Sequence, residues 1–384
     1  MSQKLKTPFH ETDKSVISST ENLLHDLRNG RMVILVDAED RENEGDLVIP
    51  AQMATPDVIN FMATYGRGLV CLSLMEERAR QLRLESMVRT NSSRTGTAFT
   101  VSIEAREGIT TGISAHDRAR TIAAAIDPTK DHTDIVSPGH VFPLVARSGG
   151  VLMRAGHTEA SIDLARLAGL YPAAVICEIM KDDGTMARLP DLLQFAQKHN
   201  LKVGTIEDLV AFRLRNDRVV QEVSQTPVTS TIGGDFMLHL YEATASTVEH
   251  VAMVKGNIYN TNPVMVRVHV LNILDDLLGV RNGSDGCELI QKSMTMIAEE
   301  GCGVLVLIQD QRAKAISMQL ANYKGNILPE RNIREQRIVD VGVGSQILRD
   351  LGIKDMILLT NSPKSVYVGL DGYGLRIIEH RSIV

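Results

Sequence analysis

Residues 32–46 read MVILVDAEDRENEGD and join an apolar run to the most acidic segment of the chain. The run at 32–36 predicts a short strand buried on both faces. Six carboxylates follow within ten residues, and Arg41 is the only cation among them. The acids are Asp37, Glu39, Asp40, Glu42, Glu44 and Asp46. Crowded acids repel one another, so the segment is either a solvated loop or a site for a divalent cation such as Mg²⁺. An EF-hand is excluded, because Ala51 stands where a loop beginning at Asp40 needs a bidentate Glu.

Strand and helix patterns alternate on both sides of this segment, which predicts a mixed α/β (α+β) fold. Ser18 to Glu21 form a capping-box pattern before a leucine-bearing helix, and Gly30 is suited to end that helix. Strands are predicted at 69–74, 97–103, 141–146, 149–153 and 173–180, and helices at 115–125, 159–170 and 189–199.

A change of pattern after residue 210 predicts a second domain. Residues 213–235 are polar and contain Pro and Gly, which is typical of a linker. A second series follows, with strands predicted at 236–241, 250–254, 264–270, 304–308 and 356–360 and a helix at 287–300. We therefore predict domains at 1–210 and 228–384, joined by a linker at 211–227.

Length and composition exclude several classes of protein. The chain has 384 residues, of which 43% are hydrophobic and 23% charged, with a net charge of −6. Apolar runs are far shorter than the roughly 20 residues of a membrane span, and the N-terminus lacks the apolar core of a secretory signal. The acidic balance argues against nucleic-acid binding. Four cysteines without a CxxC pair predict reduced thiols in a cytoplasmic protein.

The sequence RAGHTE at 154–159 combines an arginine with a predicted helix start. Amide groups at a helix N-terminus attract anions, and Arg can bind phosphate with two parallel hydrogen bonds. His157 could bind a metal or move a proton. A capped helix start with a surface Arg explains the pattern equally well. The capping box beginning at Ser114 offers the same two interpretations, an anion site or a simple helix start.

Four motifs in the first half carry a resemblance to a known family. They are RENEGD (41–46), TGISA (111–115), PGHVFP (138–143) and RAGHTEA (154–160). In this order they closely resemble 3,4-dihydroxy-2-butanone 4-phosphate synthase of riboflavin biosynthesis, over roughly residues 15–210. Ala38 departs from the pattern, because the family usually has another Asp there. The resemblance implies the conversion of ribulose 5-phosphate to L-3,4-dihydroxy-2-butanone 4-phosphate and formate.

The resemblance also implies Mg²⁺ or Mn²⁺, no organic cofactor and a homodimer in which a second subunit completes the site. By the same resemblance, Glu42 and His157 are metal ligands, and His140 and Glu178 are essential for catalysis. The implied sugar-phosphate site consists of Arg41, Glu42, Asp46, Arg154, Ala155, Gly156, His157, Thr158 and Glu178. These residues are suited to a reaction that begins by removing a proton next to a carbonyl group of the substrate, because a bound divalent ion stabilises the resulting negative charge. Cys71 is interpreted as a buried structural thiol.

Residues from about 228 onward resemble GTP cyclohydrolase II. The resemblance lies in RVH (267–269), GVLV (303–306), GVGSQILRDLG (342–352), LLTN (358–361) and GYGL (372–375). The family's three zinc-binding cysteines fall on Asn272, Gly283 and Asp285, and its Asp-x-Arg catalytic pair falls on Arg337 and Val339. Its phosphate-binding Gly-Arg-Gly stretch falls on residues 311–315, which lack those glycines.

These departures lead us to expect a catalytically dead second domain without zinc. A further hypothesis makes this half a regulatory or docking domain, for example for a separate GTP cyclohydrolase II. The alternative is a bifunctional enzyme that keeps the second activity through other ligands.

Overall fold

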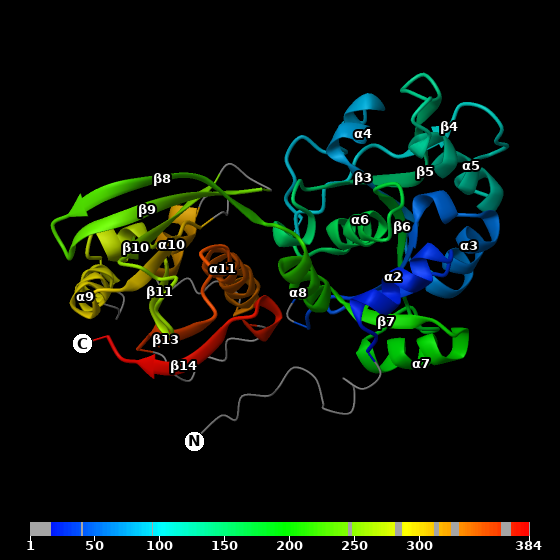
Figure 1. Cartoon of the computed structure of the whole chain (residues 1–384). Helices are drawn as coiled ribbons and strands as arrows, with labels where there is room; N and C mark the ends of the chain where they lie inside the picture. Colours follow the sequence, from blue (N-terminus) through cyan, green and yellow to red (C-terminus); the bar gives the residue numbers. More distant parts are fainter. Residues whose placement is uncertain are drawn as a thin grey trace. The chain divides into compact units, whose positions relative to one another are not determined.

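The computed structural model describes residues 17–39, 41–93, 95–244, 248–280, 286–310, 315–323, 330–361 and 370–383. The chain divides into two compact units, Met1–Val210 and Ala211–Val384 (Figure 1). Each unit is built around its own seven-stranded mixed sheet. The predicted two-domain mixed α/β fold is thereby confirmed. Among the described residues, no helix combines the length and the apolar character needed to cross a bilayer.

The first unit contains a sheet in the order β4-β5-β3-β6-β2-β1-β7. Its strands are β1 (Val33–Val36), β2 (Gly45–Pro50), β3 (Cys71–Met75), β4 (Ile103–Ala105), β5 (Ile135–Ala146), β6 (Ala173–Glu178) and β7 (Lys202–Thr205). β1 is antiparallel to β2 and parallel to β7, and β2 is antiparallel to β6. The C-terminal ends of β1 and β6 and the N-terminal end of β2 therefore lie side by side, at the same end of these strands.

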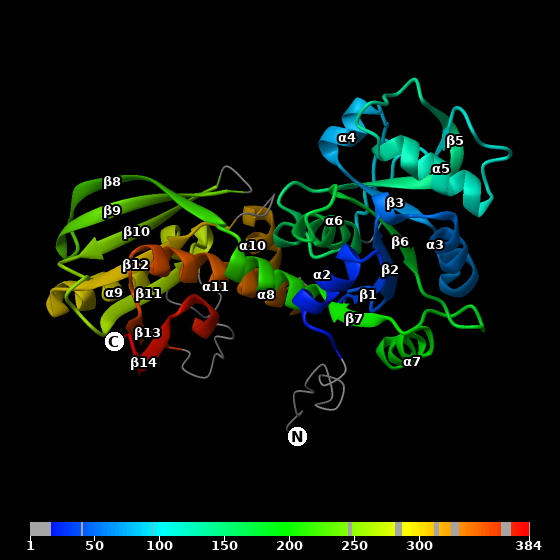
Figure 2. The same cartoon turned by 45° about the vertical axis from the view of Figure 1, so that its right-hand side comes forward.

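Helices cover both faces of this sheet (Figure 2). They are α2 (Thr20–Arg28), α3 (Pro56–Phe61), α4 (Glu76–Gln81), α5 (Ala115–Ile126), α6 (His157–Leu167) and α7 (Leu189–His199); α8 (Ile206–Asn216) follows and extends past the end of the first unit. Ile34 and Val36 pack into one core with residues of α3, α5 and α7. Successive strand residues point to opposite faces, so Val33 and Leu35 face the other side. There α6 contacts β2, β3, β5 and β6.

The predicted first helix forms, but Ser19 takes the N-cap position in place of the predicted capping box of Ser18 with Glu21. The Ser19 side chain accepts a hydrogen bond from the Asn22 amide, and Leu23 and Leu27 are fully buried. The helix ends at Arg28, and Gly30 follows with φ of +70°. Only glycine adopts this left-handed conformation without steric cost, so the predicted end of the helix is confirmed.

The second unit contains a sheet in the order β14-β13-β11-β12-β10-β9-β8. Its strands are β8 (Val220–Ser230), β9 (Gly234–Ala243), β10 (Glu249–Lys255), β11 (Val264–Val270), β12 (Gly303–Ile308), β13 (Asp355–Leu359) and β14 (Arg376–Arg381). Its helices are α9 (Gly286–Glu300), α10 (Ala315–Tyr323) and α11 (Glu330–Asp350). Phe236, Met265, Ile297, Leu305 and Leu359 lie in its core.

The structure differs from the sequence predictions in three segments. Residues 211–227 carry the end of α8 and most of β8 where a linker was predicted; β8 is an edge strand with mostly exposed residues, so its composition resembles that of a loop. Residues 149–153 contain a 3₁₀ turn, because Gly149 and Gly150 both have positive φ and cannot continue a strand. Of the predicted strand at 97–103, only Ile103 belongs to a strand.

Candidate functional site

The loop between β1 and β2 is organised by the buried carboxylate of Asp37. Its Oδ1 accepts a hydrogen bond from the Glu44 amide at 2.9 Å, and its Oδ2 accepts one from the Glu42 amide at 3.1 Å. Nη1 of Arg41 donates to the same Oδ2 at 3.0 Å and also contacts the Glu42 carboxylate. One side chain thus fixes the backbone of the acidic loop and holds Glu42 at its place beside Arg41.

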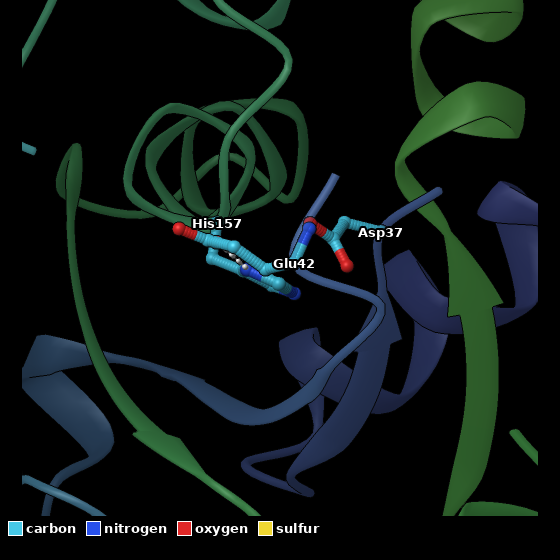
Figure 3. Close-up of side chains that lie close together, drawn as sticks. All are labelled: Asp37, Glu42 and His157. Carbon is cyan, nitrogen blue, oxygen red and sulfur yellow. Dashed lines mark hydrogen bonds and ion pairs between the residues drawn. The ribbon is translucent and has the colours of Figure 1, made fainter. Parts of the chain in front are cut away.

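His157 approaches this loop from the first position of α6. Its Nδ1 lies 3.9 Å from Oε2 of Glu42, and its Nε2 lies 3.9 Å from Oδ1 of Asp46. The Leu35 carbonyl oxygen lies 3.1 Å from Nε2 and can accept a hydrogen bond from it. Asp37, Glu42 and His157 each offer a ligand atom, and these three atoms lie within 4.8 Å of one another (Figure 3). Two elements distant in the sequence therefore form a candidate metal centre.

The charges of the cluster perturb one another strongly. Burial raises the pKa of Asp46 to about 7, against the opposing charge of His157. Burial also acts to raise the pKa of Glu42, but its ion pair with His157 and the charge of Arg41 prevail and lower that pKa to about 2. Burial acts to lower the pKa of His157, yet Asp46 and Glu42 raise it to about 9. Within the described residues, Oδ1 of Asp46 is buried without a hydrogen-bond partner.

Two guanidinium groups converge on the N-terminus of α6. A Cβ atom at Gly156, the N-cap, would lie 2.3 Å from Nη1 of Arg154 and 2.9 Å from Nη2 of Arg41. The missing side chain therefore makes room for both cations. Arg154 also donates to Oε2 of Glu159 at 2.6 Å and to Oγ1 of Thr97 at 3.2 Å. A helix N-terminus beside two arginines has the geometry and charge to bind an anion.

Glu178 reaches the same place from the end of β6. It pairs with Asp46 across β2 and β6, and its Oε2 accepts a hydrogen bond from the Leu69 amide at 2.8 Å. A Cβ atom at Gly68 would lie 2.6 Å from that oxygen and 2.4 Å from the Glu178 carbonyl oxygen. Only glycine lets the chain pass this close to the carboxylate.

These groups line one cavity of about 530 Å³. Of the residues predicted for the site, the cavity is lined by Arg41, Glu42, Asp46, Arg154, His157, Thr158 and Glu178. Ala155 and Gly156 lie directly before α6, where Ala155 is half-buried and Gly156 is buried. Cys71 also lines the cavity, and burial raises the pKa of its thiol well above the usual value.

His140 is not among the residues that line this cavity. Its side chain is 45% exposed on β5, where its Nδ1 contacts the carboxylate of Glu104. Within one copy of the chain, the predicted catalytic pair of His140 and Glu178 is therefore not assembled in the cavity.

Sequence reasoning missed two parts of the site. Asp37 appeared only as one acid of a crowded segment, although it holds the whole loop. The segment 87–97 also lines the cavity through Met87, Val88, Thr90, Asn91, Ser92, Ser93, Thr95 and Thr97. Its run of small polar residues is that of an ordinary surface loop, so no local signal identifies it.

The turn before α5 is closed from within. The Asp117 carboxylate accepts hydrogen bonds from the Thr110 amide, the Thr110 hydroxyl and the Gly112 amide, and Ser114 caps the helix. The anion at this helix start is thus a side chain of the protein itself, which favours the simple helix start over an external anion site.

Two family models cover nearly the whole chain. The model of 3,4-dihydroxy-2-butanone 4-phosphate synthase matches residues 21–212, and that of GTP cyclohydrolase II matches residues 221–382. The chain belongs to the 3,4-dihydroxy-2-butanone 4-phosphate synthase family. It is an enzyme of this class, with a GTP cyclohydrolase II domain fused to the synthase domain.

Relatives and solved structures agree with this fusion. Riboflavin biosynthesis protein RibBA of Aquifex aeolicus is 50% identical over 381 residues, covering 96% of this chain and 93% of the relative. Bifunctional riboflavin biosynthesis protein RIBA 1 of Arabidopsis thaliana is 44% identical, covering 94% and 68%. The crystal structure of RibBX, a two-domain synthase from A. baumannii, has a TM-score of 0.78 at 44% identity and covers 95% of this chain and 99% of that one.

A synthase domain solved with two magnesium ions matches with a TM-score of 0.50 at 40% identity, covering 52% of this chain and 99% of that one.

These comparisons correct the expectation of a catalytically dead second domain. The GTP cyclohydrolase II match spans almost the entire second half, and RibBA-type relatives, one of them named bifunctional, align along the chain. The physical error lay in equating lost cysteines with lost activity, because zinc also accepts imidazole and carboxylate ligands. The fusion also removes the reason to expect a separate GTP cyclohydrolase II as partner.

Few of the positions aligned with the family's GTP site can be placed. Asn272 caps a short helical turn, with its side-chain oxygen accepting from the Leu274 amide. Gly283, Asp285 and residues 311–314 lie outside the described residues, as does the side chain of Arg337. Val339 lies in α11. Nearby, Asp276 accepts a hydrogen bond from the Asn272 amide and lies 2.9 Å from Nε2 of His269.

Proposed function

We propose that the first unit converts D-ribulose 5-phosphate to L-3,4-dihydroxy-2-butanone 4-phosphate and formate with the help of Mg²⁺ or Mn²⁺. One observation carries this proposal: a carboxylate–imidazole cluster lies beside two arginines at a helix N-terminus in a single cavity. The first feature suits a divalent cation and the second suits a phosphate group, and the proposed substrate needs both.

The residues present fit a hard divalent cation. Glu42 and His157 supply an oxygen and a nitrogen donor, and Asp37 lies within reach of both. A cation here would also offset the negative charge around Asp46, whose Oδ1 is buried without a hydrogen-bond partner in the described part of the chain. Such an ion stabilises negative charge that develops on adjacent substrate oxygens. We assign Glu42 and His157 as its ligands.

The remaining residues bind and orient the sugar phosphate. Arg41 and Arg154, with the amides of Ala155 and Thr158, would hold the phosphate at the start of α6, because the Gly156 amide already donates to the Arg154 carbonyl oxygen. Asp46 and Glu178 lie opposite each other across β2 and β6, where they can hydrogen-bond substrate hydroxyl groups. The Glu178 carboxylate is held by the Leu69 amide, so it is placed to take or return a proton.

We infer a homodimer from the position of His140. This residue lies on β5 apart from the cavity of its own chain, and its imidazole is exposed. A second copy could bring its own His140 to the cavity and complete the catalytic set with Glu178. The dimer, like the cytoplasmic location, is part of the proposal.

Formate release from ribulose 5-phosphate tests the main assignment. Glu42→Ala and His140→Ala should each abolish Mg²⁺-dependent turnover, while Glu39→Ala, an exposed change in the same loop, should leave it intact. Unchanged turnover in Glu42→Ala would show that the metal site is misassigned.

Mixing the two inactive variants tests the dimer. If each site uses residues of both copies, random exchange of subunits should restore about a quarter of the wild-type sites. The mixed dimers then hold one site without either substitution. No recovery after verified subunit exchange would mean that His140 acts within its own chain.

GTP cyclohydrolase II activity is proposed for the second unit, on the strength of the family match over residues 221–382. The three-cysteine zinc site of the family does not fit this chain, since the second half contains only Cys287 and Cys302. We derive no step through zinc. GTP turnover by the full-length chain, with metal content measured in parallel, tests the activity; absence of any pyrimidine product would refute it.

A further inference from the structure

The strand pair that carries His140 is interrupted at that residue. β4 and β5 are antiparallel, with Ile103 opposite Val141, but the next residue, Glu104, pairs with Val136. In this register, residues 137–140 of β5 form an excursion that β4 does not match. The excursion ends at His140, so the side chain stands at an irregular point of the sheet rather than in a regular ladder.

Glu104 meets His140 across this irregularity. Its Oε1 forms a hydrogen bond with Nδ1 of the imidazole. The Glu104 side chain is 15% exposed, whereas that of His140 is 45% exposed. A carboxylate at Nδ1 accepts a proton there, so Nε2 is left as the nitrogen able to exchange a proton with another molecule.

Two glycines make the space for this carboxylate. A Cβ atom at Gly112, whose φ is +88°, would lie 1.5 Å from Oε1 of Glu104. A Cβ atom at Gly139 would lie 2.6 Å from Cγ of Glu104 and 2.1 Å from the Ile103 carbonyl oxygen. The Gly112 turn is itself fixed by Asp117, whose Oδ2 accepts from the Gly112 amide at 3.0 Å. Two separate sequence motifs, 111–115 and 138–143, thus converge on one acid that belongs to neither.

We propose that Glu104 is a positioning residue that holds the His140 imidazole in one orientation and one tautomer for proton transfer through Nε2. This inference rests on the proposed catalytic role of His140. The competing interpretation is a structural role, in which the pair only stabilises the contact between β4 and β5. The experiment must distinguish the two roles.

The experiment compares Glu104→Gln with Glu107→Gln, a matched change at an exposed residue three positions later. The amide of Gln can donate to Nδ1 and favours the wrong tautomer, so we expect kcat for formate release to fall about 10- to 100-fold while KM stays within about twofold. E107Q should match the wild type.

Subunit mixing distinguishes a specific catalytic defect of E104Q from a failure of the variant to fold. E104Q mixed with E42A should recover about a quarter of the wild-type sites, while E104Q mixed with H140A should recover none. The proposal is overturned if kcat of E104Q stays within twofold of wild type or if the loss is confined to KM. Full activity of H140A would instead refute the proposed role of His140 and the inference with it.

Discussion

Replacing Asp37 by Ala should make the loop between β1 and β2 less ordered and should destabilise the first unit. The substitution removes the acceptor of three hydrogen bonds, two from the amides of Glu42 and Glu44 and one from Arg41. The Asp37 side chain is only 1% exposed, so water cannot simply take its place. Each hydrogen bond to a charged group contributes about 1.5–3 kcal/mol, and part of this is regained as the loop relaxes into solvent. We expect the free energy of unfolding to fall by about 3–5 kcal/mol.

Urea unfolding of the full chain, followed by far-UV circular dichroism, measures this change. Hydrogen exchange of peptides spanning residues 33–50 identifies the transition of the first unit, and these amides should lose protection in the Asp37→Ala variant. Glu39→Ala, which lies exposed in the same loop, should stay within about 0.5 kcal/mol of wild type. Equal stability of the two variants would refute the loop-organising role of Asp37.

Asp37→Asn separates this role from direct metal binding. The amide keeps one acceptor oxygen but loses the charge. If Asp37 organises the loop, stability and Mg²⁺ affinity should fall together. A loss of Mg²⁺ affinity at unchanged stability would instead identify Asp37 as a ligand in its own right.

Two further predictions concern stability away from the cavity. Burial lowers the pKa of His250 to about 4, so the unfolded state binds more protons than the folded state below pH 6.5. The free energy of unfolding of the second unit should therefore fall by roughly 2 kcal/mol between pH 7 and pH 5. His250→Gln should flatten this pH dependence in urea unfolding, and an unchanged slope would contradict the prediction. The buried Arg78 donates to three backbone carbonyl groups at and beyond the end of α5; Arg78→Lys should therefore cost about 2–4 kcal/mol in thermal unfolding, whereas exposed Arg80→Lys should cost almost nothing.

Local patterns predicted most elements because their signals lie within one or two helical turns. The first helix, the apolar run of β1 and the helix at α7 were all visible from spacing alone. β8 was missed for a physical reason, since an exposed edge strand has the composition of a surface loop. α6 begins at His157 and not two residues later, because Gly156 takes the N-cap position.

By itself, the sequence determined the family, the two-domain division and the residue types available for chemistry, because motifs and periodicity depend on near neighbours along the chain. Only the tertiary structure decided which of them act together. Asp46, His157 and Glu178 meet because β2, α6 and β6 are neighbours in the sheet and on its face. His140 is separated from them and joined to Glu104 because β4 and β5 lie toward the opposite edge. Such contacts depend on strand order between distant residues, and no local pattern records that order.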